Sequence, residues 1–342
     1  MLRNLSLAVV LLLVALVASA VLLRDWWERP LTLPAEGIVL QVEPGDSLSR
    51  LSRHLAKRGV LDHERLLNIM GRLLGADSRI LRGEYRLNQG ITPEGLLTLL
   101  QSGDTVRYLV TLPEGITLSD ALALIQASQG IRSTLAGAND SRLLDLVAPA
   151  ASAEGYFLPE TYQYERGDSD FKLLSEAHRL MEEALAHAWQ QRRAELPYSE
   201  PYEALIMASI IEKETGLAQE RPAIGGVFVR RLELGMRLQT DPAVIYGLGD
   251  AFQGNLQRKH LNDASNAYNS YRHHGLPPGP IALPGRDALM AAVDPAPGDA
   301  LYFVARGDGS HEFSATLKEH EDAVRRFQLS RRANYRSSPE NK

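Results

Sequence analysis

Two carboxylates and a lysine close the apolar segment at residues 199–216. They are Glu212, Lys213 and Glu214, and Thr215 follows them. A carboxylate at the end of a buried apolar helix is desolvated, which raises its pKa and keeps it protonated near neutrality. This pattern is typical of general acid chemistry, in which a positioned carboxyl group gives a proton to a reacting group.

The segment is predicted to be a buried helix capped by Ser199 and ended by Gly216 in a left-handed conformation. Its middle, residues 204–211, is almost wholly apolar and has no polar face. The helical period does not choose between Glu212 and Glu214, because each shares a face with small or apolar residues. The alternative is a last turn that emerges into solvent, where Glu and Lys are common.

The composition places the chain among ordinary globular proteins. It has 342 residues, of which 44% are hydrophobic and 23% charged, enough for two folded domains behind a membrane segment. A formal net charge of -5 argues against a nucleic-acid partner, since such proteins usually carry a basic surplus. The chain has no cysteine, which excludes disulfides, thiolate catalysis and Cys-ligated metals.

A charge-free apolar run at residues 5–23 is long enough to span a bilayer. Trp26 and Trp27 follow it, as expected for anchors at the membrane interface. The competing interpretation is a cleaved signal peptide, with a small-residue site at 18–20. The run continues beyond that site, which favours a retained anchor. In both cases the rest of the chain is expected to work outside the cytoplasm.

One local pattern recurs between residues 38 and 131. A strand-like run is followed by Gly, any residue, and Ser or Thr, and then by an amphipathic helix. We expect each hydroxyl to cap its helix by accepting from a backbone N–H of the first turn. The three copies are Gly45-Asp46-Ser47, Gly90-Ile91-Thr92 and Gly115-Ile116-Thr117.

The first copy, IVLQVEPGDSLSRLSRHLAKRGVL, resembles the opening strand and helix of a LysM domain. That resemblance implies a small α/β subdomain at residues 38–105 that binds glycans containing N-acetylglucosamine. The alternative is a unit that only packs against the next domain, because no aromatic cluster marks a sugar platform in it.

The second half of the chain combines aromatic and proline-rich stretches. Residues 154–164 are rich in aromatic and acidic side chains, which fits either a glycan groove or a buried strand. An amphipathic helix is predicted at about 171–195. Prolines and glycines at 275–285 exclude helix and strand there, and a stiff loop of this kind suits ligand positioning.

Two further predictions concern the end of the chain and its histidines. Residues 300–305 and 311–315 are predicted to form a hairpin, and Thr316 to cap a final helix. The adjacent His273 and His274 lack the spacing of metal ligands, so we expect surface or hydrogen-bonding roles for them.

Taken together, several ordered motifs resemble those of the MltG (YceG-like) family of endolytic murein transglycosylases. The motifs are EGYFLPETY, MASIIEKET, LQTDPAVIYG, YNSYRHHGLPPGPI, YFVA and TLKEH. The resemblance implies that the catalytic acid is the glutamate followed by Thr or Ser, which is Glu214 here. We expect no cofactor and no metal.

The remaining expectations about the site also follow from the resemblance. Sugar-binding residues are expected among the motif positions, with Glu212, Lys213 and Thr215 in supporting roles. The expected sugar contacts are Tyr162, Gln239, Tyr268, Asn269 and Tyr271.

The resemblance implies an enzyme that cuts peptidoglycan between N-acetylmuramic acid and N-acetylglucosamine and leaves 1,6-anhydro ends. Its partners would be peptidoglycan strands and peptidoglycan synthases, at the inner membrane with a periplasmic catalytic part. Two alternatives stay open. One is a hydrolytic muramidase that pairs Glu214 with another acid such as Asp241, and the other is a non-catalytic wall-binding scaffold.

The expected fold class is α+β, with a single transmembrane helix, a LysM-like α/β subdomain and a mixed α+β catalytic domain around a buried central helix. The expected divisions are a cytoplasmic N-terminus at 1–4, the transmembrane helix at 5–23, a linker at 24–37, the LysM-like subdomain at 38–105, the catalytic domain at 106–330 and a polar tail at 331–342.

Overall fold

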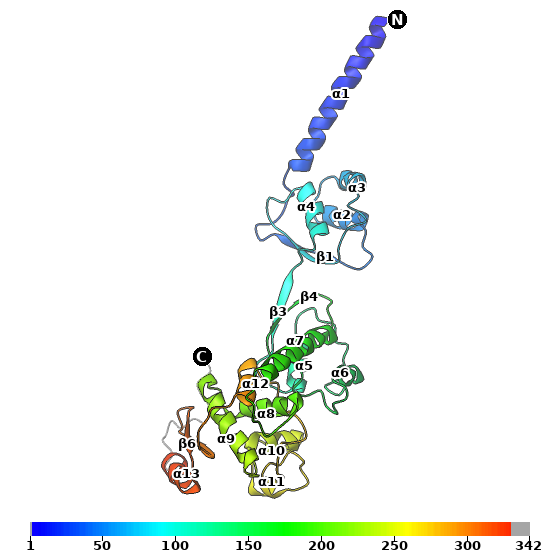
Figure 1. Cartoon of the computed structure of the whole chain (residues 1–342). Coiled ribbons are helices and arrows are strands. Elements are labelled where there is room, and N and C mark those ends of the chain that lie inside the picture. Colours follow the sequence, from blue (N-terminus) through cyan, green and yellow to red (C-terminus); the bar gives the residue numbers. More distant parts are fainter. Residues whose placement is uncertain (1, 330–342) are drawn as a thin grey trace. The chain divides into compact units, whose positions relative to one another are not determined.

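The structure is a computed structural model that describes residues 2–329, in which helices and short strands are mixed (Figure 1). The predicted polar tail at 331–342 lies outside the described residues. Contacts divide the chain into two compact units. The first comprises residues 1–108 and 164–167, and the second comprises 109–163 and 168–342.

Helix α1 (Leu2–Glu28) opens the chain. Its segment Val9–Glu28 has a mean hydropathy of 2.2, and none of that segment is buried. By length and composition it can therefore cross a bilayer, although a signal sequence meets the same test.

The first unit continues with a strand, two helices, a strand and a helix. Strands β1 and β2 pair antiparallel, with Ile38 opposite Leu87. The predicted hydroxyl caps are confirmed, because Ser47 accepts from Arg50 N and Thr92 from Gly95 N. These elements are β1 (Ile38–Val42), α2 (Leu48–Lys57), α3 (Glu64–Leu73), β2 (Gly83–Leu87) and α4 (Pro93–Ser102).

The chain leaves the first unit through β3 (Arg107–Thr111) and returns to it through β4 (Thr161–Glu165), and these two strands pair. Within the first unit, Glu84 anchors this passage: it accepts a hydrogen bond from the Tyr108 hydroxyl (2.6 Å) and forms an ion pair with Arg166. By contacts, residues 164–167 therefore belong to the first unit although they follow the boundary predicted at residue 105.

The second unit is mainly helical and is built around a large apolar core. The third predicted cap is confirmed, since Thr117 accepts from Asp120 N. Its helices are α5 (Leu118–Gln126), α6 (Ser141–Leu146), α7 (Asp170–Gln190), α8 (Pro201–Glu214), α9 (Arg221–Glu233), α10 (Asp241–Leu248), α11 (Arg258–Asn262), α12 (Arg286–Val293) and α13 (Leu317–Val324).

Helix α8 contributes much of that core, and its residues Ala204 to Glu212 are all buried. It packs against α7, α9, α10 and α12. Helix α9 contributes to the same core, where its Gly225 comes very close to α12. A Cβ at that position would lie 2.6 Å from the Ala291 carbonyl oxygen, so glycine permits this approach of the two helices.

Both predicted ends of α8 are wrong. The N-cap is Glu200, and the Glu203 carboxylate accepts from the backbone N–H groups of Ser199 and Glu200. The helix thus begins with a capping box between Glu200 and Glu203, without the expected serine hydroxyl. At the other end, Thr215 leaves the helix in an extended conformation with φ -145°, and Gly216 is not left-handed.

Three other predictions about the second unit have definite outcomes. Helix α7 ends at Gln190, earlier than predicted, and the Trp189 carbonyl accepts from the Arg192 side chain instead of continuing the helix. No helix or strand lies between Asn262 and Arg286, as the prolines predicted. The hairpin of β5 (Tyr302–Ala305) and β6 (His311–Ser314) is confirmed, as is the Thr316 cap.

Candidate active site

The two acids at the end of α8 have different surroundings. The carboxylate of Glu212, in a residue only 8% exposed, is occupied on both oxygens. Arg221 donates to its Oε1 across 2.6 Å, and Gly285 N donates to its Oε2 across 2.9 Å. Burial raises the pKa of Glu212, while these two donors act in the opposite direction. Glu212 therefore joins α9 and the loop before α12 to α8.

Lys213 and Arg221 extend the same support. Lys213 Nζ donates to the Gly115 carbonyl across 2.8 Å. Arg221 also donates to Glu114 across 2.8 Å and lies 3.5 Å from Asp287. The last turn of α8 is thus held in place by groups from three other segments. Glu212 and Lys213 thus both belong to the framework of this turn.

Glu214 lies one residue beyond this network and is half-buried. Within residues 2–329, no group donates to its carboxylate at standard hydrogen-bond geometry, but the Thr240 hydroxyl faces it. Burial raises the pKa of Glu214 to about 7. The Thr240 hydroxyl and the Arg231 guanidinium lower this pKa, and the charge of Asp241 raises it. Glu214 can therefore hold or release a proton near neutral pH.

The segment that faces Glu214 has an unusual backbone. Gln239 has φ 53°, the left-handed region that a residue with a side chain adopts at a cost. Ser270 fixes the next residue, because Thr240 N donates to Ser270 Oγ (2.9 Å) and that hydroxyl donates to the Thr240 carbonyl (3.1 Å). The Gln239 side chain is exposed beside Thr240, where it is free to meet a ligand.

The Thr240 hydroxyl is a buried polar group without a partner. The residue is 1% exposed, and its Oγ1 makes no hydrogen bond of standard geometry to any other part of residues 2–329. This unpaired hydroxyl faces the Glu214 carboxylate and lowers its pKa.

Asp241 follows Thr240 and is exposed. The Tyr271 hydroxyl donates to its Oδ1 across 2.7 Å. Asp241 is the next residue after Thr240, about 3.8 Å away at Cα. Its carboxylate therefore lies near that of Glu214, whose pKa it raises. Tyr271 thus lies near Glu214, whose charge also acts on its phenol, while Gln239 adjoins this group only as the neighbour of Thr240 in the chain.

One cation is built into the same region. Arg231 is 7% exposed and donates to the carbonyls of Leu301 (2.7 Å) and Leu238 (2.7 Å). Its guanidinium lies 5.1 Å from the ring centroid of Tyr302. A cation fixed in this way favours the charged form of Glu214 after the proton has left.

The structure places Thr215, Asn269 and Tyr162 in the framework. Thr215 Oγ1 donates to Glu220 (3.4 Å) and accepts from Leu217 N (3.0 Å), so it fixes the turn after α8. Asn269 is fully buried, and its amide group donates to three backbone carbonyls. Tyr162 is 6% exposed, with its hydroxyl donating to the Leu158 carbonyl at 2.5 Å.

The two histidines bond the backbone. His273 Nε2 lies 3.1 Å from the Ala264 carbonyl oxygen, and His274 Nδ1 lies 3.0 Å from that of Gly235. This agrees with the hydrogen-bonding role predicted for them. Across the described part of the chain, no cluster of three or more His, Cys, Asp or Glu side chains could hold a metal ion.

Sequence reasoning missed three residues of this site. Arg221 and Arg231 lie on α9, where isolated arginines normally indicate a solvated face, and their buried partners are distant in sequence. Thr240 was easier to find from the sequence. A threonine directly before Asp-Pro is typical of a helix start, and it adjoins Gln239 in the LQTDP motif.

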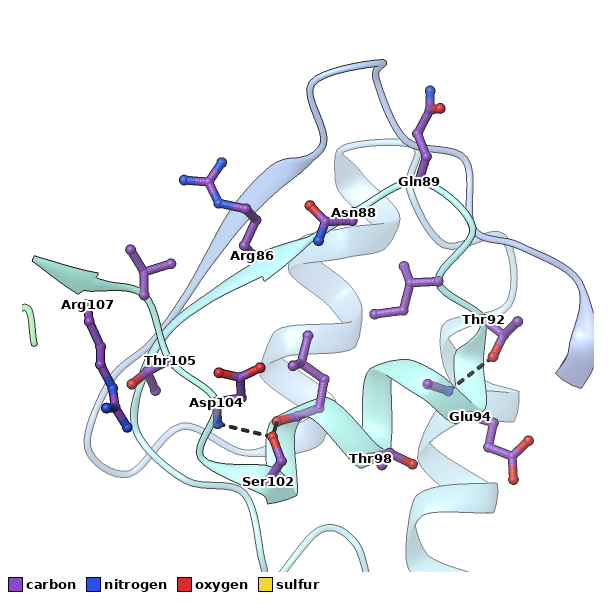
Figure 2. Close-up of a pocket in the computed structure, with 14 residues that line it drawn as sticks. Arg86, Asn88, Gln89, Thr92, Glu94, Thr98, Ser102, Asp104, Thr105 and Arg107 are labelled. Atoms are coloured by element: carbon purple, nitrogen blue, oxygen red, sulfur yellow. Dashed lines mark hydrogen bonds between the residues drawn. The ribbon is translucent and has the colours of Figure 1, made fainter.

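A separate hollow of about 1030 Å³ lies in the first unit, beside α4 and β2 (Figure 2). Its side chains include Arg86, Asn88 and Gln89. Ser102 accepts from Asp104 N there (3.0 Å), as Figure 2 shows. The lining offers hydrogen-bonding groups, among them the side chains of Asn88, Gln89 and Thr92.

Comparisons with known proteins agree on one family. The model of the YceG-like family matches residues 40–326. An endolytic murein transglycosylase of Bacillus subtilis (strain 168) is 28% identical over 306 residues, which cover 84% of each chain. The endolytic murein transglycosylase of Streptococcus pneumoniae serotype 2 (strain D39) is 26% identical over 318 residues, covering 83% of this chain and 57% of the pneumococcal protein.

A solved structure shows the same relationship. The crystal structure of a putative YceG-like protein from Listeria monocytogenes matches with a TM-score of 0.53 and 27% identity. The match covers 84% of this chain and 99% of the Listeria chain.

Proposed function

The chain belongs to the YceG-like family, and from this premise we propose that it is a lytic transglycosylase of peptidoglycan in which Glu214 carries the proton. One observation supports the choice of residue most strongly. Glu212 is occupied by Arg221 and Gly285, whereas Glu214 is uncommitted and burial raises its pKa to about 7.

In the first step the protonated Glu214 gives its proton to the glycosidic oxygen between N-acetylmuramic acid and N-acetylglucosamine. The bond from that oxygen to C1 of the muramic residue breaks, and positive charge develops at C1. Glu214 becomes a carboxylate, which the Arg231 cation and the Thr240 hydroxyl stabilise. Such a proton transfer by a positioned acid contributes about 10²- to 10⁴-fold to the rate.

In the second step the muramic 6-hydroxyl attacks C1 and gives its proton to Glu214. The new bond closes a 1,6-anhydro ring, and the acid returns to its starting form. No water is consumed, so one residue serves as acid and then as base. This requires a pKa near the working pH, which the surroundings of Glu214 supply.

The Asp241–Tyr271 pair favours a second candidate function, a hydrolytic muramidase. In that reaction Asp241 would activate a water molecule while Glu214 acts as the acid. The two reactions differ in their products, because hydrolysis adds one water to each new end. We place the transglycosylase first, because of the family membership.

Digestion of purified sacculi by the full chain in detergent tests the proposal. Mass spectrometry of the muropeptides should show 1,6-anhydro ends, and Glu214→Gln should reduce them by at least about a hundredfold. Glu212→Gln, which keeps the shape of a supporting residue, serves as the matched variant and should retain substantial activity. Reducing ends in place of anhydro ends would assign the muramidase reaction.

The remaining proposals concern location and partners. The apolar segment of α1 supports an inner-membrane anchor, with the catalytic unit in the periplasm and cutting nascent strands near peptidoglycan synthases. The strand–helix–helix–strand order of residues 38–87 supports the LysM-like interpretation of the first unit. Binding of the isolated wall polymer to variants of the Figure 2 hollow, such as Asn88→Ala, would test a glycan role for it.

A further inference from the structure

Four tyrosines of the second unit gather around one stretch of backbone, and one of them, Tyr268, is among the sugar contacts expected from the sequence. The rings of Tyr156 and Tyr202 are stacked, with centroids 5.7 Å apart and an angle of 12° between their planes. Those of Tyr246 and Tyr268 meet edge to face at 4.9 Å. We call these four residues the tyrosine face, and each of them is half-buried.

Gly279 joins the two pairs. A Cβ at this position would lie 3.0 Å from the Tyr202 hydroxyl and 3.3 Å from that of Tyr268, so the two phenolic oxygens converge on the same bare stretch of backbone. Within the described residues, neither hydroxyl makes a hydrogen bond at standard geometry, and neither is sealed from solvent. Two polar groups are therefore available to a ligand beside apolar ring surface.

A buried acid backs the tyrosine face. Glu154 is 6% exposed and accepts from Leu118 N across 2.9 Å. The Tyr246 hydroxyl lies 3.4 Å from its other oxygen. This contact orients the phenol of Tyr246 and leaves its ring edge against Tyr268. The face is therefore preorganised before any ligand arrives.

The tyrosine face lies at a definite distance from the catalytic acid along one helix. Tyr202 is near the start of α8, and Glu214 is its last residue. The twelve residue steps from Tyr202 to Glu214 correspond to about 18 Å at about 1.5 Å per residue. Tyr246 marks the nearer side of the face, because it lies five steps, or about 8 Å, along α10 from Asp241.

We propose that the tyrosine face binds a sugar ring of the same glycan strand, several sugars away from the bond that is cut at Glu214. The inference rests on the proposed function. Phenyl rings pack on the C–H face of a pyranose, while phenolic hydroxyls bond its hydroxyl and acetamido groups. An enzyme with such a distant contact gains binding energy only from long strands, which favours cutting within a strand over trimming short ends.

Substrate length provides the test. The substrates are long glycan strands freed of stem peptides and a tetrasaccharide of the same repeating unit, which extends only two sugars to either side of the cut and falls short of Tyr202. The variant Tyr202→Phe keeps the ring and removes the converging hydroxyl that lies farthest along α8 from Glu214. For long strands its kcat/KM should fall about fivefold, mainly through KM, and for the tetrasaccharide it should stay within about twofold of wild type.

Tyr198→Phe is the matched control, because it removes a hydroxyl that bonds the Ala292 carbonyl in the core and lies outside the tyrosine face. It should leave the ratio of the two substrates unchanged. An equal loss on both substrates, or no loss on long strands, would overturn the proposal.

A binding measurement separates this proposal from the proposed function. In a Glu214→Gln background, long strands should bind about fivefold more weakly when Tyr202→Phe is added, whatever the wild-type enzyme does to the bond. If wild type yields no anhydro ends but this difference persists, only the reaction assignment fails. Equal binding by Glu214→Gln with and without Tyr202→Phe would overturn the proposal for the tyrosine face, even if the wild-type enzyme has full transglycosylase activity.

Discussion

Arg221 and Glu212 form a buried ion pair, with 2.6 Å between the guanidinium nitrogen and the carboxylate oxygen and side chains only 7% and 3% exposed. The pair fixes the last turn of α8 and leaves Glu214 as the acid that is free to exchange a proton. Breaking a buried pair is costly because the remaining charge loses its partner.

We therefore expect Arg221→Met to lower the free energy of unfolding by about 3 kcal/mol. The double variant Arg221→Met/Glu212→Met should recover part of this loss, because it leaves no unpaired charge at that position. Urea unfolding of wild type, Arg221→Met, Glu212→Met and the double variant measures the coupling free energy between the two side chains. Additive losses would show that the pair is not coupled.

The pH dependence of activity should follow the proton on Glu214. Its pKa is raised to about 7, so kcat/KM should fall as pH rises above about 7, where the acid form is lost. Asp241 raises this pKa and Thr240 lowers it. The alkaline limb should therefore move to lower pH in Asp241→Asn and to higher pH in Thr240→Val. Shifts of both variants in the same direction would contradict this electrostatic assignment.

Glu154 should make stability depend on pH. Burial raises its pKa to about 7, while in the unfolded chain it is about 4.3. Between these values the folded state holds a proton that the unfolded state has lost. The free energy of unfolding should thus fall as pH rises through this window, by up to about 1.4 kcal/mol per pH unit. Glu154→Gln removes this contribution. The contribution of Glu214 to the pH dependence is the same in wild type and in the variant, so it cancels in the comparison. Parallel stability curves for wild type and variant would refute the assignment.

Substitutions of Gln239 distinguish the effect of its backbone conformation on stability from the effect of its side chain on substrate binding. Because φ is 53°, Gln239→Gly should fold at least as well as wild type, whereas Gln239→Val should lose about 1–2 kcal/mol. If the exposed amide meets the sugar, Gln239→Gly should still raise KM several-fold. Thermal unfolding and steady-state kinetics on long strands measure the two effects, and an unchanged KM would remove Gln239 from the binding residues.

Much of the local structure followed from local rules. The hydroxyl caps at Ser47, Thr92 and Thr117, and the hairpin that ends in Ser314, depend on short patterns that fix backbone donors and acceptors nearby. The start of α8 could not be predicted in this way, because Glu200 and Glu203 form a capping box one residue after Ser199. The Glu203 carboxylate accepts from the backbone N–H groups of Ser199 and Glu200.

The sequence by itself determined an apolar helix with two acids at its end, and the resemblance of its motifs pointed to Glu214. Only the tertiary structure showed why the acids differ. Gly285, which bonds Glu212, is 73 residues away in the chain, and Thr240 comes from another helix start. A pKa depends on desolvation and on the charges within a few ångströms, and helical periodicity does not report which distant residues supply them.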